Sequence, residues 1–189
     1  ITGIGALTPI GNSVSAFRKG LEQGESGAVP ITKFDSSDFK TQFACEIKDF
    51  DPSEALDRKE ARRMDAFCQY AMVVADEAMQ DSGLDTDRID SDRAGVIWGS
   101  GIGGLRTLER EIEDNTVRDG IPRYNPFMIP KMIVDIAPGH ISIKYGLKGI
   151  NYSTVSACSS STHALVNATD YIRLGRADVM VTGGSEAAV

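Results

Sequence analysis

The stretch YSTVSACSSSTH at residues 152–163 decides how the chain folds around one cysteine. Small and β-branched residues precede Cys158, as in a short buried strand. Serine and threonine at positions 159–162 are residue types that begin helices. Apolar residues then recur at helical spacing as far as Leu174, and Gly175 follows where glycine commonly ends a helix. The pattern predicts a strand, a sharp turn that holds Cys158, and a helix.

The predicted position of Cys158 has a chemical consequence. The first backbone N–H groups of a helix have no intrahelical partner and carry the positive end of the helix dipole. They stabilise a thiolate, the form of cysteine that attacks an acyl group, and they can also stabilise an oxyanion. A buried, inert cysteine is equally compatible with the local pattern, because cysteine is common in protein cores. Ala157 and the small serines fit either a site that admits a substrate or close packing.

Length and composition restrict the class of protein. The chain has 189 residues, which suits one domain or one half of a larger one. A net charge of −7 argues against a general nucleic-acid binder. The sequence has neither an apolar run of the roughly 20 residues that a membrane span needs nor a signal peptide. It opens on Ile1 within an apparent strand, so we expect a few residues to precede it.

The three cysteines lie far apart in the sequence. Cys45, Cys68 and Cys158 suggest neither a disulfide framework nor a zinc site, and a reducing cytoplasm is the expected location. Cys68 falls in a helical pattern and Cys45 in a strand-like one. We expect both to be packed thiols.

Periodicity and turn residues predict the other elements. Gly3 and Gly5 in the first strand suggest the close approach of another backbone. Asn12 or Ser13 is expected to cap the first helix, and Gly83 to end the longest one. The expected strands are 1–7, 94–99 and 179–181, and the expected helices are 12–23, 58–82 and 131–136.

A glycine-rich loop, GSGIGG at residues 99–104, follows the strand predicted at 94–99. It matches the G-x-G-x-x-G pattern of dinucleotide-binding proteins. Such a site needs a helix and then a second buried strand. Residues 105–120 are highly charged and never become a buried strand. The sequence therefore disfavours a nucleotide site.

Four cations, Arg58, Lys59, Arg62 and Arg63, cluster at the start of the long predicted helix. Taken alone, such a run is best interpreted as a solvated helix end. Cations at a helix N-terminus oppose the helix dipole, however, so a functional purpose would explain their position. A basic patch would attract an acidic partner protein.

Two motifs resemble one known family. VSACSSSTHA at residues 155–164 and ADVMVTGGSE at residues 177–186 resemble the nucleophile motif and the following strand of the β-ketoacyl-acyl carrier protein synthases, most closely the synthase II type. The resemblance covers essentially the whole chain, whereas the family's chain is about twice as long and contains two similar halves. It implies that residues 1–189 form the N-terminal thiolase-like half. The implied fold is α/β with α-β-α layers, in which helices cover both faces of a mixed five-stranded sheet.

The resemblance also implies an activity. Cys158 would take an acyl group from acyl carrier protein and condense it with malonyl-acyl carrier protein, with loss of CO2, to give a 3-oxoacyl product in fatty-acid elongation. No metal, nucleotide or nicotinamide cofactor is implied. The family's two catalytic histidines, its lysine and its second oxyanion donor lie in the second half, so residues 1–189 alone are expected to be inactive.

The resemblance assigns further roles by position. The implied acyl pocket is lined by Ile102, by Ala157 and, from the partner subunit of a homodimer, by Met128, where the family often has an aromatic residue. The implied carrier-protein contacts are Lys59, Arg62, Arg63 and Arg123. His163 follows Cys158 by five residues and should point away from the helix mouth, while His140 is structural by resemblance. Neither histidine is expected to be catalytic.

Two alternatives stay open within the resemblance. A polyketide-type ketosynthase would use the same cysteine chemistry. A non-catalytic ketosynthase-like subunit generally lacks the nucleophilic cysteine, so Cys158 counts against it. Neither a nucleic acid nor a membrane is expected as a partner.

Overall fold

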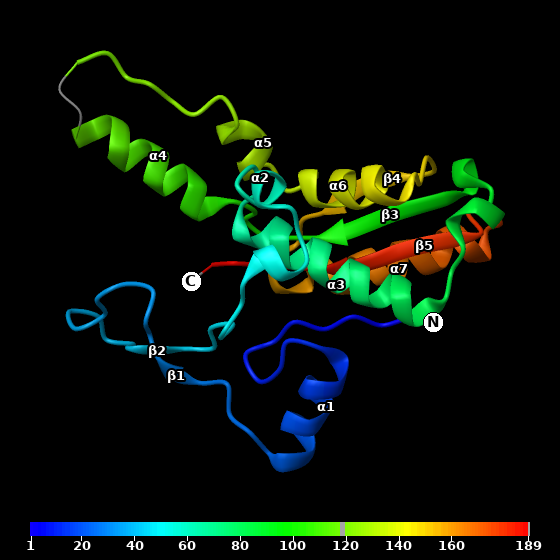
Figure 1. The fold of residues 1–189 in the computed structure, drawn as a ribbon, viewed down its shortest axis with the longest axis horizontal. Coiled ribbons are helices and arrows are strands. Elements are labelled where there is room, and N and C mark those ends of the chain that lie inside the picture. The colour runs from blue at the N-terminus through cyan, green and yellow to red at the C-terminus, as the bar shows by residue number, and fades with distance from the viewer. Residues whose placement is uncertain (118–119, 189) are drawn as a thin grey trace. The chain divides into compact units, whose positions relative to one another are not determined.

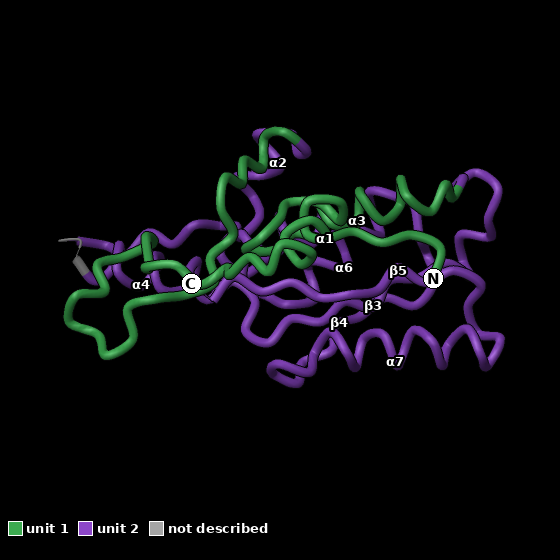
Figure 2. The backbone as a smooth tube through the Cα atoms, turned by 90° about the horizontal axis from the view of Figure 1, so that it is seen from below, with its two compact units in different colours: residues 1–54, 73–84, 189 green, residues 55–72, 85–188 purple. Residues whose placement is uncertain are grey.

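The structure of the chain is a computed structural model that describes residues 1–117 and 120–188. It contains two compact units (Figure 2). Unit 1 comprises residues 1–54 and 73–84, and unit 2 comprises residues 55–72 and 85–188. All the residues that the sequence singles out as candidate site residues belong to unit 2.

Unit 1 contains helix α1 (Val14–Gln23) and the short antiparallel pair β1 (Val29–Pro30) and β2 (Phe43–Ala44). The Ser13 side chain caps α1 by accepting a hydrogen bond from the N–H group of Ala16. Gly24, with a φ of 66°, ends the helix in the left-handed region. The prediction of this helix and of its cap is confirmed.

The strand expected at residues 1–7 is not formed. The N–H group of Ile4 donates to Asp81 Oδ2 at 2.9 Å and that of Ala6 to Glu77 Oε2 at 2.8 Å, so side chains take the place of a strand partner. A Cβ atom on Gly5 would lie 1.9 Å from the carbonyl oxygen of Val74. The glycines do permit the close approach of another backbone, but it is the backbone of a helix.

Three parallel strands form the sheet of unit 2 in the order β4-β3-β5 (Figure 1). They are β3 (Ala94–Gly99), β4 (Asn151–Thr154) and β5 (Val179–Gly184). Every residue of the central strand β3 is buried, which is typical of parallel sheets with both faces covered. Gly99 lies opposite both Thr154 and Gly184, so the carboxyl ends of the three strands share one edge.

Helices cover both faces of this sheet. Helix α7 (Ser160–Arg173) packs on one face and α6 (Ile136–Tyr145) on the other (Figure 2). Under α7, the buried side chains of Ile97, Ala164 and Ala168 form a core cluster. The two alanines let the helix approach the strands closely. The predicted helix after Cys158 and its end at Gly175, which has a φ of 65°, are confirmed.

The α/β class and the layered arrangement, with helices on both faces of a sheet, are confirmed, but the sheet differs from the expected five mixed strands. The described residues form a three-stranded parallel sheet and a separate two-stranded antiparallel pair. Residues 1–7 add no strand, because the N–H groups of Ile4 and Ala6 bond to carboxylates instead of to another strand.

The long helix expected at residues 58–82 is two helices, α2 (Arg58–Ala61) and α3 (Ala66–Ser82). Asp57 caps α2, and Asp65 starts α3 by accepting a hydrogen bond from the N–H group of Phe67 at 3.3 Å. The side chain of Gln69 donates to the Ala61 carbonyl oxygen at 2.9 Å and so closes the end of α2. The sequence did not predict this break, because apolar residues recur at helical spacing on both sides of it.

The remaining helices lie between β3 and α6. Helix α4 (Leu105–Val117) follows the glycine-rich loop, and α5 (Met128–Met132) precedes α6. The helix expected at 131–136 is therefore wrong, because Ile133 is extended and α6 begins at Ile136. Pro138 is compatible with α6 because it lies in the first helical turn. Short 3-10 turns occur at Pro52–Glu54, Thr86–Arg88, Ser91–Arg93 and Ala157–Ser159. Within the described residues, no helix has the length and apolar character to cross a membrane.

Candidate active site

Cys158 lies in the 3-10 turn Ala157–Ser159, between β4 and α7, and is exposed. Ala157 has a φ of 51°, in the left-handed region that residues with a Cβ atom rarely adopt. The conformation costs about 1–2 kcal/mol. The predicted strand, sharp turn and helix are thus confirmed, and the turn presents the Cys158 thiol at the N-terminal end of α7.

Ser160 holds this strained turn together. Its side chain is buried, and its Oγ accepts a hydrogen bond from the Ser156 N–H group at 2.9 Å and donates to the Ala157 carbonyl oxygen at 2.7 Å. A Cβ atom on Gly99 would lie 2.4 Å from the backbone between Ser160 and Ser161. The absence of a side chain at Gly99 therefore lets the start of α7 lie directly on the end of β3.

The two histidines have structural surroundings. His163 Nδ1 lies 2.6 Å from Ser156 Oγ, so its side chain bonds to the residue that directly precedes the cysteine turn, and the expectation that it points away from this region is not confirmed. His140 lies on α6 and is half-buried. Burial lowers its pKa, and the nearby Glu60 carboxylate opposes this only in part.

The glycine-rich loop at residues 99–104 binds a carboxylate of the protein itself. Glu186 Oε2 accepts hydrogen bonds from the N–H groups of Gly101 at 2.6 Å and Ile102 at 3.2 Å. Ser100 Oγ accepts from the Gly103 N–H group at 3.2 Å. A nucleotide phosphate would bind to backbone N–H groups of this kind, but here the Glu186 carboxylate already accepts their hydrogen bonds. The arrangement therefore supports the interpretation against a nucleotide site.

The loop also lies next to the cysteine turn. A Cβ atom on Gly101 would be 3.6 Å from Ala157 Cα. Ile102, which is 45% exposed, is the next residue of the loop. The structure thus places Gly101, the residue before Ile102, beside Ala157, the residue before Cys158, at the carboxyl edge of the sheet. Sequence reasoning did not identify Glu186; the only local signal was an acidic residue just after the glycines that end β5.

Met128 is the first residue of α5 and is half-buried. The N–H group of Gly104 donates to the Met132 carbonyl oxygen at 3.0 Å, which joins the glycine-rich loop to the end of α5. The Arg63 guanidinium lies 5.0 Å from the ring centroid of Phe127, which directly precedes Met128. Arg63, a predicted carrier-protein contact, therefore packs against the residue next to Met128, a predicted pocket residue.

The predicted basic contacts, Lys59, Arg62, Arg63 and Arg123, are all exposed. Across residues 1–117 and 120–188, no carboxylate forms an ion pair with any of them. Lys59 lies on α2, Arg62 and Arg63 follow it, and Arg123 lies in the segment between α4 and α5. The buried Asp65 carboxylate accepts a hydrogen bond from Thr107 Oγ1 at 2.6 Å and so fastens α4 to the turn after Arg62 and Arg63.

The other two cysteines differ from one another. Cys68 is buried, and burial, with a smaller effect of the Asp65 carboxylate, raises its pKa to about 12. The prediction of a packed thiol is confirmed for Cys68. It is wrong for Cys45, which is exposed because it follows the two-residue strand β2, whose Phe43 is itself 62% exposed. Over the described part of the chain, no group of three or more His, Cys, Asp or Glu side chains is arranged to hold a metal ion.

Comparison with known proteins gives consistent relatives. The family described as "Beta-ketoacyl synthase, N-terminal domain" matches residues 1–189. The chain is 43% identical over 189 residues to 3-oxoacyl-[acyl-carrier-protein] synthase 2 of Synechocystis sp., covering 100% of this chain and 45% of that protein. It therefore spans about half the length of the curated relatives that it matches.

Two solved structures share the fold. The ishigamide ketosynthase/chain length factor superposes with a TM-score of 0.90 at 27% identity, covering 100% of this chain and 47% of that chain. A second match comes from the structure of a type II PKS acyl-carrier protein in complex with its ketosynthase. One chain of that structure superposes with a TM-score of 0.83 at 26% identity, and the match covers 99% of this chain and 50% of that chain.

Proposed function

This chain belongs to the β-ketoacyl synthase family, and from that premise we propose that it forms the N-terminal half of a 3-oxoacyl-[acyl-carrier-protein] synthase. The observation that carries the proposal is the exposed Cys158 in the strained turn at the start of α7. An exposed thiol just before a helix N-terminus is an arrangement that favours covalent acyl transfer. The proposed setting is the cytoplasm.

In the proposed first step, the Cys158 thiolate attacks the thioester carbonyl carbon of an acyl group carried on acyl carrier protein. A new carbon–sulfur bond forms, and the carrier's thiol leaves. The backbone N–H group of Cys158 stabilises the oxyanion together with a donor from the C-terminal half. Malonyl-acyl carrier protein then loses CO2, and the resulting carbanion equivalent attacks the acyl-enzyme. A carbon–carbon bond forms, Cys158 is released, and the product is a 3-oxoacyl-carrier protein.

The proposed acyl pocket is lined by Ile102 and Ala157 and, across a homodimer, by Met128 of the second copy. Support comes from the short distance between the glycine-rich loop and Ala157 and from the link between that loop and α5. Met128 is a flexible side chain, so we expect it to fit acyl chains of several lengths.

The proposed partner is acyl carrier protein, an acidic protein, bound at Lys59, Arg62, Arg63 and Arg123. These exposed cations remain without a carboxylate partner within the described ranges although the chain carries a net charge of −7. The related ketosynthase that is in complex with its acyl-carrier protein gives further support. Charge reversal at Arg62 should raise the KM for acyl carrier protein and leave the KM for a small pantetheine thioester unchanged. Charge reversal at Lys148, an exposed residue between α6 and β4 that forms no ion pair within the described residues, is the matched control.

The proposed second half would cover the exposed apolar surface of α7 and its flanks. These residues are Val155, Leu165, Val166, Ile172 and Leu174. Several exposed apolar side chains on one helix and its flanks are the kind of surface that a further domain can cover. The same half would supply the catalytic histidines and the lysine, so residues 1–189 alone should not condense substrates.

A polyketide-type ketosynthase is the second candidate within the family, because one structural neighbour is the ketosynthase of a type II PKS. The identity of 43% to a 3-oxoacyl-[acyl-carrier-protein] synthase 2, against 26% to that neighbour, favours fatty-acid elongation. A non-catalytic subunit is disfavoured by Cys158 itself.

The test is a condensation assay of the protein that contains this chain and its C-terminal half, with acyl- and malonyl-carrier protein as substrates. Wild type should release CO2 and form a 3-oxoacyl product, and Cys158→Ala should abolish product formation. Cys45→Ala, which removes the other exposed thiol, is the control and should retain full activity. Product formation by Cys158→Ala at the wild-type rate would overturn the proposal.

A further inference from the structure

We infer that Glu186 is a positioning residue that holds the glycine-rich loop against the cysteine turn and so sets which acyl groups Cys158 accepts. The inference rests on the proposed function, because it concerns the acyl pocket of that same site. It assigns a role to a carboxylate that makes no proposed contact with the substrate.

The hydrogen bonds of Glu186 define its role. One oxygen, Oε2, accepts from the backbone of both Gly101 and Ile102, at 2.6 Å and 3.2 Å. The other, Oε1, lies 3.5 Å from Ser100 Oγ. Hydrogen bonds to a carboxylate are stronger than those between neutral groups, and two of these fix consecutive peptide groups. The two peptide groups on either side of Gly101 are therefore held by one side chain.

The anchor of Glu186 is itself fixed. Glu186 follows the end of β5, and the N–H group of the preceding residue, Ser185, donates to the Gly99 carbonyl oxygen at 3.0 Å. Ser185 Oγ accepts from the indole N–H group of Trp98 at 2.9 Å. Because β5 and β3 are paired neighbours, the carboxylate reaches the loop from a rigid sheet edge.

The position of the glycine-rich loop matters because the cysteine turn lies beside it. A Cβ atom on Gly101 would lie 2.9 Å from Glu186 Oε2 and 3.6 Å from Ala157 Cα, so Gly101 fills the space between the carboxylate and the cysteine turn. Gly103, with a φ of 60°, leaves the loop in a conformation that other residues rarely adopt. Without Glu186 the loop would lose its hold at Gly101 and Ile102, and the Ile102 backbone would no longer be held in the loop beside the cysteine turn.

The test compares Glu186→Ala with Glu186→Gln in the protein that contains both halves. The readout is the rate of Cys158 acylation, by mass spectrometry, from hexanoyl- and palmitoyl-carrier protein. Gln keeps an acceptor oxygen for the two N–H groups, whereas Ala removes it. We expect Ala to change the ratio of the two acylation rates by about tenfold, as expected for the loss of the hydrogen bonds that hold the loop backbone, and Gln to restore most of the wild-type ratio. Restoration by Gln distinguishes positioning from a general need for charge.

Gly101→Ala is the second variant, because its Cβ atom would press on the carboxylate without removing it. It should shift the same ratio in the same direction as Glu186→Ala. An unchanged ratio in both variants, with wild type active, would overturn the inference and leave the proposed function intact. Absence of any acyl group on Cys158 in wild type would instead overturn the proposed function.

Discussion

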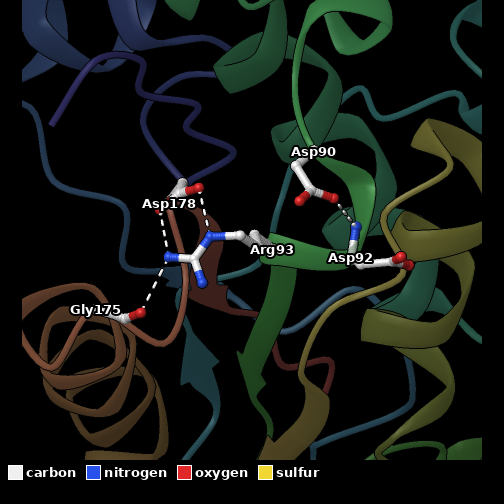
Figure 3. A network of polar contacts seen from close by, with 5 residues as sticks. All are labelled: Asp90, Asp92, Arg93, Gly175 and Asp178. Carbon is white, nitrogen blue, oxygen red and sulfur yellow. Dashed lines mark hydrogen bonds and ion pairs between the residues drawn. The ribbon is translucent and has the colours of Figure 1, made fainter.

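Both edges of the parallel sheet in unit 2 carry polar side chains, but these side chains make different contacts. At the amino edge, Arg93 directly precedes β3 and Asp178 directly precedes β5. Their side chains form a bidentate ion pair, with Nε–Oδ2 at 2.7 Å and Nη2–Oδ1 at 2.6 Å (Figure 3). The Arg93 guanidinium also donates to the Gly175 carbonyl oxygen, and Asp90 caps the turn that leads into β3.

At the carboxyl edge, the polar groups hold backbone in costly conformations. Ser160 and Glu186 bond to the cysteine turn and to the glycine-rich loop, respectively. The turn includes the left-handed Ala157 and leaves Cys158 exposed. In open α/β sheets, ligands bind outside the carboxyl ends of the strands. In this sheet the backbone strain at Ala157 therefore lies at the edge where we propose the active site, while the ion pair lies at the opposite edge.

The largest effect is expected for Ala157→Val. A β-branched residue is strongly disfavoured at a φ of 51°, so the turn should shift and take Cys158 with it. We expect the acylation rate of Cys158 to fall by more than about tenfold and stability to fall by about 1–2 kcal/mol. Ala157→Gly is the control: it relieves the strain and should be at least as stable as wild type in urea unfolding. A Val variant with wild-type stability would show that the turn is not strained.

A smaller effect is expected for Ser160→Ala. This change removes the acceptor of the Ser156 N–H group and the donor to the Ala157 carbonyl oxygen. Loss of stability by about 1–2 kcal/mol is expected, because Ser160 is buried and its partners would be left unpaired. The neighbouring Ser159 is exposed and makes no capping hydrogen bond, so Ser159→Ala should change the free energy of unfolding very little. Equal losses in the two variants would contradict the role assigned to Ser160.

A third prediction concerns the buried thiol of Cys68, which contrasts with the exposed thiol of Cys158. Its folded-state pKa of about 12 lies above the ordinary value of 9.0, so its contribution to stability is fully present below about pH 9 and is lost as the pH rises toward 12. We expect the alkaline loss of stability to be shallower in Cys68→Ala than in wild type. Identical alkaline profiles from urea unfolding would show that the thiol does not remain protonated in the folded state.

The smallest effect is expected at the amino edge. The hydrogen bonds from Arg93 lower the pKa of Asp178 from its ordinary value of 3.8. The contribution of Asp178 is therefore present above that value and is lost as the pH falls through the lower folded-state pKa. Asp178→Asn should lower the unfolding midpoint slightly at neutral pH and flatten its decline in acid, while condensation stays unchanged. Reduced condensation in a stably folded Asp178→Asn protein would contradict the separation of the two edges.

Local sequence signals predicted the parts of the site that depend on neighbouring residues. The strand, the turn at Cys158 and the end of α7 at Gly175 follow from residue types within one stretch. The break at Asp65 was missed because the apolar period continues through it, although an aspartate before an apolar run is a capping signal.

Interactions between distant residues were not predictable in this way. Glu186 bonds to Gly101 across 85 residues of sequence, and nothing in either segment specifies the other. Ile4 likewise bonds to Asp81 across 77 residues, which decides that residues 1–7 do not join a sheet. The roles of the pocket residues Ile102 and Met128 remain predictions that rest on the resemblance and on the arrangement described above. The same holds for the proposed carrier-protein contacts, which are Lys59, Arg62, Arg63 and Arg123.

The most direct test of the central claim is the location of the acyl group after acyl-carrier protein is mixed with the protein in the absence of malonyl-carrier protein. Peptide mapping by mass spectrometry should find the acyl group on Cys158, with Cys45 and Cys68 unmodified. An acyl group found on Cys45, or no covalent acyl group under conditions in which condensation proceeds, would contradict the account.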